Sequence, residues 1–185
     1  FGDLTLESSR DISNVWAVTY NDFDDTIYYI VRPSSSGSVF RLNADGTSTS
    51  LYSSDAPAGI TDDPKDGDIF FTRDFPGIIS RVPEGSSSSG TWVSNIPGGG
   101  DDDPAGILIV PDYYAGDLAS PGDGFFTDRG FNGNERVLSF SPDTAQGEVL
   151  LLSFNRFDGL YGIFATNDKI VLVEHGNGLL ELTES

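Results

Sequence analysis

Hydrophobic and polar residues alternate in short runs along the whole chain. No window shows a sustained 3.6-residue apolar period bounded by helix caps. The runs are separated by turns in which Gly, Pro, Asp and Ser are frequent, and the 185 residues include 22 Gly and 10 Pro. This pattern predicts many short β-strands, tight turns and almost no helix.

The predicted strands recur as one kind of hairpin. Each hairpin has an apolar strand, a pair of polar or charged residues, a turn with glycine and a second amphipathic strand. It appears as "IYYIVRPSSSGSVFRLNADG" from Ile27, "IFFTRDFPGIISRVPEG" from Ile69, "GFFTDRGFNGNERVLSFSPD" from Gly124 and "IVLVEHGNGLLELTES" from Ile170. The chain therefore contains four copies of one supersecondary unit.

A short segment rich in small residues precedes every hairpin. The four segments are "VWAVTYND" from Val15, "PAGITDDP" from Pro57, "PAGILIVPD" from Pro104 and "LYGIFATND" from Leu160. Small residues allow backbones to crowd near an axis, so we expect these to be inner strands. One more apolar strand follows the first three hairpins, in "STSLYS" from Ser48, "GTWVSNI" from Gly90 and "GEVLLLSF" from Gly147.

Four antiparallel strands per repeat define a propeller blade, so the sequence predicts an all-β fold with a single β-propeller domain over residues 1–185. The predicted blades cover about 15–53, 57–97, 104–154 and 160–185. The last repeat lacks an outer strand, and residues 3–9, "DLTLESS", supply an unassigned one. We expect this N-terminal strand to close the last blade and the ring, which leaves no bare edge. A larger propeller, completed by another chain or by further sequence, is the alternative.

The blades resemble those of NHL-repeat and gluconolactonase-type propellers. The resemblance rests on Pro-x-Gly-Ile, an Asp/Gly turn, an aromatic strand, a charged pair, a glycine and a strand ending in "NADG" or "SPD". It covers nearly the whole chain and implies architecture more than activity. Those families usually have six blades, whereas four are counted here.

The composition narrows the range of partners. The net charge is −19, from 29 acidic residues, mostly Asp, against 10 basic ones, which disfavours nucleic acid and anionic membranes. No apolar run is long enough for membrane insertion, and cysteine is absent. The chain begins at Phe1 without an initiator methionine. We expect an extracellular or secreted protein whose signal peptide is not visible.

A ring of aspartates is the candidate metal site. Four positions before the small residue of each inner strand the repeats carry Ser13, Asp55, Asp102 and Asp158, and Asp103 is adjacent. Three carboxylates converging near the axis require a cation or protons, and oxygen-rich turns suit calcium. The alternative is that each Asp caps its own turn.

The residue pairs that end each middle strand form a second candidate ring. They are Val31-Arg32, Arg73-Asp74, Asp128-Arg129 and Glu174-His175. They could pair between neighbouring blades or be solvated loop ends. The lactonase resemblance implies a divalent cation held by Glu, Asn and Asp, which maps onto Glu174 and Asp128 with His175 as general base. Asn14 and Asn132 are candidates for the Asn by loop position alone.

Aromatic residues near the inner strands or in the long connection 112–124 are candidate ligand-binding residues. They are Trp16, Tyr113, Tyr114 and Tyr161, which suit stacking on a sugar or another flat ligand if they do not serve packing.

The sequence thus favours a non-enzymatic propeller whose acidic channel face binds a cation, a small molecule, a sugar or a protein partner. A metal-dependent lactonase-type hydrolase and a structural or assembly subunit are the alternatives, and an oligomer is compatible with all three.

Overall fold

The computed structural model describes residues 11–74, 77–94, 96, 103–129, 135–145, 149–154 (backbone alone), 159–176 and 178–182. These residues form strands β1 to β15 and no helix, so none of them belongs to a helix able to cross a membrane. The all-β class predicted from the sequence is confirmed.

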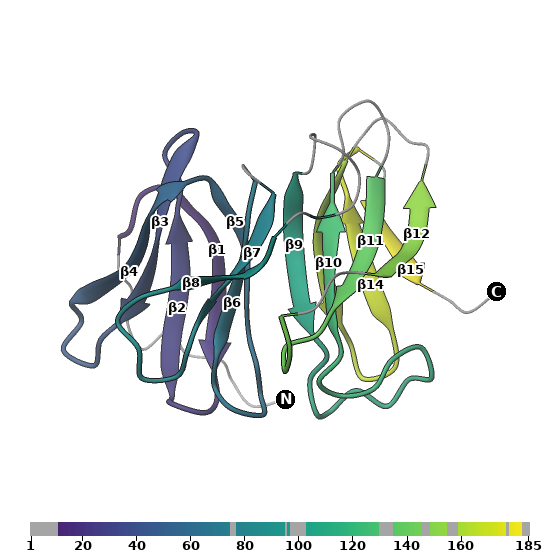
Figure 1. Cartoon of the computed structure of the whole chain (residues 1–185), viewed down its shortest axis with the longest axis horizontal. Coiled ribbons are helices and arrows are strands. Elements are labelled where there is room, and N and C mark those ends of the chain that lie inside the picture. Colours follow the sequence, from purple (N-terminus) through teal and green to yellow (C-terminus); the bar gives the residue numbers. More distant parts are fainter. Residues whose placement is uncertain are drawn as a thin grey trace, which may run out of the picture.

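Four antiparallel sheets follow one another along the chain, each in the strand order of the sequence (Figure 1). The first sheet contains β1 (Val15–Asn21), β2 (Thr26–Val31), β3 (Ser36–Leu42) and β4 (Ser48–Asp55). The second contains β5 (Pro57–Asp62), β6 (Ile69–Arg73), β7 (Ile78–Val82) and β8 (Gly90–Val93).

The third sheet contains β9 (Pro104–Ile109), β10 (Gly124–Asp128), β11 (Glu135–Phe140) and β12 (Val149–Phe154). The fourth has three strands, β13 (Leu160–Ala165), β14 (Ile170–Glu174) and β15 (Gly178–Leu182). Each sheet therefore corresponds to one sequence repeat, and the N-terminal strand expected in residues 3–9 lies outside the described residues.

The first strands of the sheets pack side by side. Strand β5 contacts β1 on one side and β9 on the other, and β9 contacts β13. No comparable packing joins β1 and β13 within the described residues, so the four sheets form an open arc in which only consecutive inner strands pack together. The sheets are thus not closed into a ring by the described residues, and the closure expected from residues 3–9 stays a prediction.

Three apolar clusters fill the joints between consecutive sheets, since side chains on a strand alternate between its two faces. Phe71 lies in the cluster between the first and second sheets, whereas its neighbour Phe70 lies in the cluster between the second and third. Phe126 and Phe125 divide in the same way between the second and third joints. The doubled aromatics of the repeats thus serve two joints at once.

The inner strands approach so closely that glycine is required. A Cβ added at Gly59 would collide with the carbonyl oxygen of Ala105, and one added at Gly106 would lie 2.7 Å from the Cα of Gly162. A bulge at the start of each inner strand brings the backbone to this position. Thr72 secures the second joint, because its hydroxyl accepts from Gly59 N at 2.8 Å and donates to Ala105 O at 2.7 Å.

Replacing Gly106 should test this constraint. We expect Gly106→Ala to lower the free energy of unfolding by about 1–3 kcal/mol, because a methyl group has no room against the backbone of β13. Urea unfolding followed by circular dichroism measures the change. Gly90→Ala is the matched control, since a Cβ there meets nothing within 4 Å, and it should change stability by less than about 0.5 kcal/mol. Equal effects of the two variants would contradict the packing argument.

Candidate functional site

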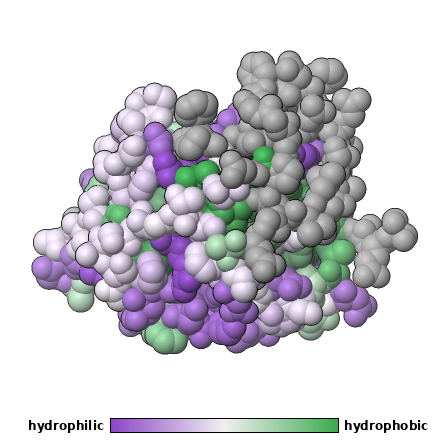
Figure 2. Space-filling model, viewed as in Figure 1, coloured by the Kyte–Doolittle hydropathy of each residue, from purple (hydrophilic) through white to green (hydrophobic). Residues whose placement is uncertain are grey.

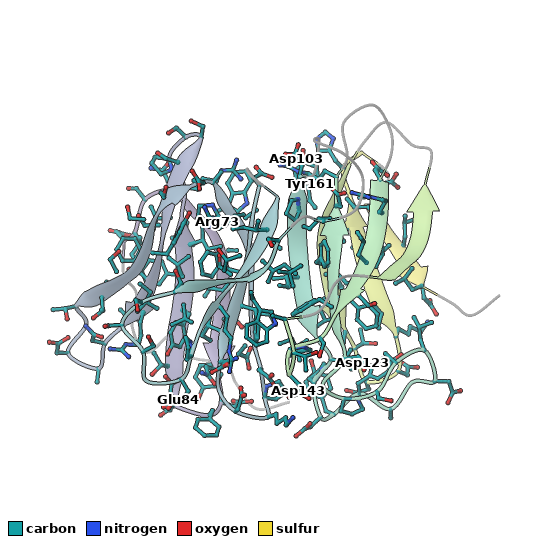
Figure 3. The ribbon with its side chains drawn as sticks, viewed as in Figure 1. Arg73, Glu84, Asp103, Asp123, Asp143 and Tyr161 are labelled. Atoms are coloured by element: carbon teal, nitrogen blue, oxygen red, sulfur yellow. The ribbon has the colours of Figure 1, made fainter. Side chains whose placement is uncertain are left out.

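One end of the sheets collects the charged pairs predicted from the sequence. The inner strands begin there and the second strands end there, and Figure 3 labels Arg73, Asp103 and Tyr161 at this end, opposite Glu84, Asp123 and Asp143. We call this end the charged-pair face and define it by residues from all four sheets, namely Trp16, Arg32, Asp74, Arg129, Tyr161 and His175.

A single carboxylate connects three sheets on the charged-pair face. The buried Asp74 accepts from Arg32 of the first sheet at 2.5 Å through Oδ2, and from Arg129, which follows β10, through Oδ1. Burial lowers the pKa of Arg129, but the charge and hydrogen bond of Asp74 outweigh it and the pKa is raised. The pairs therefore do meet between neighbouring blades, as one of the two interpretations of the sequence proposed.

Aromatic rings extend this bridge at both ends. The guanidinium of Arg32 lies 5.0 Å from the ring centroid of Trp16, and that of Arg129 lies 5.2 Å from the ring centroid of Tyr161. The Tyr161 ring in turn lies 5.7 Å from the ring of His175. Both Trp16 and Tyr161 are exposed, so an exposed aromatic ring with an arginine over it lies at each end of the bridge.

Several guanidinium donors of this end remain free. Among the described residues, Nη1 of Arg32, Nε of Arg129 and Nε of Arg73 are buried without an acceptor. Buried polar groups normally find partners, and a charged donor forms strong hydrogen bonds with carboxylates. These donor atoms are themselves buried, so a ligand would approach the arginines through the exposed 14% of the Arg32 side chain and 19% of the Arg129 side chain.

The predicted metal ligands are only partly described. Asp55 forms an ion pair with Arg73, and Asp103 uses its backbone N–H to donate to Asp128 Oδ1 at 2.9 Å. Asp102 and Asp158 lie outside the described residues. No group of three acidic or His side chains suited to a metal occurs in the described ranges. The calcium site stays a prediction.

The residues mapped from the lactonase resemblance occupy different environments. Asp128 is fully buried and accepts from Nε of Arg136 at 2.9 Å, and Glu174 is buried as well. His175 is exposed, and its backbone N–H donates to Gly159 O at 3.0 Å. Asn14 lies in the same region, where its carbonyl accepts from Arg32 N at 3.0 Å, and Asn132 lies outside the described residues. The catalytic assignment of these residues stays a prediction.

The four candidate aromatic residues do not form one cluster. Trp16 and Tyr161 lie on the charged-pair face, whereas Tyr113 donates its hydroxyl to Ala165 O at 3.5 Å, at the far end of β13. Tyr114 is buried in the apolar cluster between the third and fourth sheets. Packing thus accounts for Tyr114, and the structure leaves Trp16 and Tyr161 as the pair that flanks a common site.

Among the described residues, aspartates are most numerous at the end opposite the charged-pair face. Its turns between the first two strands of the blades carry Asp22, Asp24, Asp25, Asp62, Asp63, Asp66, Asp68, Asp112, Asp117 and Asp123. Figure 2 shows hydrophilic residues gathered along this lower edge. Burial raises the pKa of Asp62 and of Asp63, and neighbouring aspartates raise both further. Charge repulsion is therefore concentrated away from the bridge.

Comparison with solved structures supports the propeller architecture. A chain described as a nidogen/laminin complex matches with a TM-score of 0.65 and 18% identity, over 86% of this chain and 56% of that chain. Virginiamycin B lyase from Staphylococcus aureus matches with a TM-score of 0.59 and 18% identity, over 93% and 56%. The computationally designed Ika4 protein matches with a TM-score of 0.55 and 11% identity, over 98% of both chains.

The first two neighbours are β-propellers of the NHL and LDL-receptor type, so the fold of this chain is a β-propeller. At these identities the likeness concerns the fold alone, and the chain spans slightly more than half the length of those two neighbours. A scan of protein-family models and a search of curated proteins each found no match.

The acidic end predicts a pH dependence of stability. The pKa of Asp62 in the folded protein is raised above its ordinary value. At pH values between the unfolded and the folded pKa, the folded protein therefore binds more protons than the unfolded chain. This group consequently makes the stability fall as the pH rises through that range. Thr19 Oγ1 donates to Asp62 at 2.8 Å. In the Asp62→Asn variant the amide oxygen still accepts this hydrogen bond but carries no charge, so we expect the stability to fall less steeply with rising pH. Thermal unfolding from pH 4 to pH 7 measures it.

Asp117→Asn is the control for this pH dependence, since Asp117 is exposed. It should leave the slope of stability against pH unchanged. A slope that is the same in the native protein and in Asp62→Asn would contradict the assignment to Asp62.

Proposed function

We propose that this chain is a non-enzymatic recognition module that binds a carboxylate-bearing sugar on the charged-pair face. The observation that supports it most is the Arg32–Asp74–Arg129 bridge, in which two arginines share one carboxylate and keep buried donors without an acceptor in the described residues. A ligand carboxylate would pair with the exposed parts of these two guanidinium groups, whose side chains are 14% and 19% exposed.

The flanking rings favour a sugar as the rest of the ligand. Trp16 and Tyr161 expose aromatic surfaces on either side of the bridge, and such surfaces stack on the apolar face of a sugar ring. The net charge of −19 opposes an anionic ligand at long range, but salt screens that field and leaves short contacts at the bridge largely intact. Binding should therefore tolerate or gain from moderate salt.

The solved neighbours are consistent with a recognition role without assigning one. One is described as a nidogen/laminin complex, which is a protein–protein assembly. A protein partner that presents an acidic side chain would use the same donors. We also propose an extracellular setting for this module.

A lyase or hydrolase is the second candidate. A catalytically inactive His-to-Ala variant of virginiamycin B lyase is among the matched structures, and His175 is the single histidine of this chain. Recognition is the better supported function because Asp128 of the implied catalytic set forms an ion pair with Arg136. Turnover of lactones that depends on His175 and on an added divalent cation would favour the enzyme instead.

Titration with glucuronate tests the recognition proposal. We expect glucuronate to change the fluorescence of the exposed Trp16, and glucose to have no comparable effect, because glucose lacks the carboxylate. Arg129→Gln should weaken glucuronate binding by about tenfold or more, which is about 1.4 kcal/mol, because a charge-assisted donor is lost.

Lys65→Gln is the control variant, since Lys65 is an exposed cation that pairs with Asp143 at the opposite end. It should bind glucuronate as the native protein does. Equal binding of glucose and glucuronate, or an unchanged affinity in Arg129→Gln, would contradict the proposed site.

A further inference from the structure

Both ends of the open arc expose apolar sheet faces. The first sheet presents the first end face, which we define as Val18, Tyr20, Ile27, Val31 and Phe40. The fourth sheet presents the last end face, which we define as Gly162, Phe164, Val171, Val173 and Leu179. In a water-soluble chain, two such faces mark surfaces that another element covers.

The first end face repeats the residues that fill the internal joints. Val18 occupies the position of Ile60, Ile107 and Ile163 in the other inner strands, and each of these packs against the preceding sheet. Their exposed fractions are 8%, 5% and 7%, whereas Val18 is 63% exposed. The first sheet therefore carries the contact residue of a joint whose preceding sheet is not among the described residues.

The last end face repeats the other half of the same joint. Gly59 and Gly106 are closely approached by the backbone of the following inner strand, and Gly162 is the next residue of this series. A Cβ added at Gly162 would meet only Val173 of its own sheet, at 3.2 Å. The fourth sheet therefore keeps the space into which a following inner strand fits.

The two faces are complementary to each other. In the first joint, Thr19 faces the second sheet and donates to Asp62 at 2.8 Å. In the fourth sheet, Phe164 occupies the position that Thr19 has in the first sheet. In the first sheet, Tyr20 occupies the position that Asp62 has in the second sheet. In a joint between the two end faces, Phe164 would therefore meet Tyr20 where the first joint pairs Thr19 with Asp62. A joint between the last end face and the first end face would thus resemble the internal joints in two respects: the inner-strand backbones could approach equally closely, and apolar side chains would fill the space between the sheets.

We propose that a second copy of this chain covers both faces. The last end face of each copy packs on the first end face of the other, and two such head-to-tail joints close a ring with two-fold symmetry. The end-to-end match with the Ika4 chain, 98% of each, shows that an arc of this extent also occurs as a whole protein chain. Repulsion between copies of charge −19 is screened at high ionic strength, so the pairing should tighten with salt.

The mass of the chain in solution is the first test. Sedimentation equilibrium at high ionic strength should give a discrete species of twice the 19.8 kDa chain mass. A monomer at all concentrations would overturn the proposal. Such a result would be expected if blades of a different polypeptide, and not a second copy, cover the two end faces. A series of ever larger species would also overturn it, because the joints would then not close.

Two charge substitutions test the head-to-tail geometry. Val18→Glu and Leu179→Glu each place a carboxylate on one end face at an exposed position, so the monomer should keep its fold. Each should raise the dissociation constant of self-association about a hundredfold or more, since a charge is buried without a partner. Tyr113→Glu adds the same charge at an exposed residue outside both faces and should remain dimeric.

Mixing the two variants separates this geometry from a symmetric one. The Val18→Glu variant keeps an intact last end face, and the Leu179→Glu variant keeps an intact first end face, so an equimolar mixture should form a one-to-one complex through one joint. Pairing of like faces predicts no rescue on mixing. A mixture that stays monomeric while the native chain is dimeric would overturn the head-to-tail joint.

Discussion

The close approach of the inner strands is the constraint on which this structure depends. At Gly59 and Gly106 the neighbouring backbone takes the place of a side chain. Strands this close can form only where small residues occupy the centre, so the Ala-Gly-Ile segments and the bulges beside them set the spacing of the sheets. The apolar pairs on the next strand then fill the wedge that opens outward between the sheets.

That geometry also creates the charged-pair face. Because every second strand ends beside the start of an inner strand, the residues that follow it are brought together across the joints. Asp74 can therefore reach Arg32 and Arg129, which are separated from it by 42 and 55 positions. A buried carboxylate between two guanidinium groups is stable because its charge is compensated on both sides, and guanidinium donors of both arginines stay without an acceptor among the described residues.

The periodicity of the sequence was sufficient to predict the strands, because alternation and turn residues are local properties. It also identified the charged pairs at the ends of the middle strands. It could not identify which pairs meet, since Asp74 acts as the common partner only through the angle between sheets. The same limit applies to Tyr114, whose burial depends on the fourth sheet, and to the closure of the ring, which depends on the curvature summed over four joints.

The two ends of the sheets divide the electrostatic roles of the molecule. The turn end accumulates aspartates, and burial, with a further contribution from neighbouring carboxylates, raises the pKa of Asp62 and Asp63, while the charged-pair face balances its carboxylates with arginines. Under the proposed function, a ligand carboxylate would therefore be disfavoured at the turn end and would bind at the bridge. Completing the ring would leave both ends accessible, because the joints lie on the side faces of the sheets, so assembly and ligand recognition would use separate surfaces of the same fold.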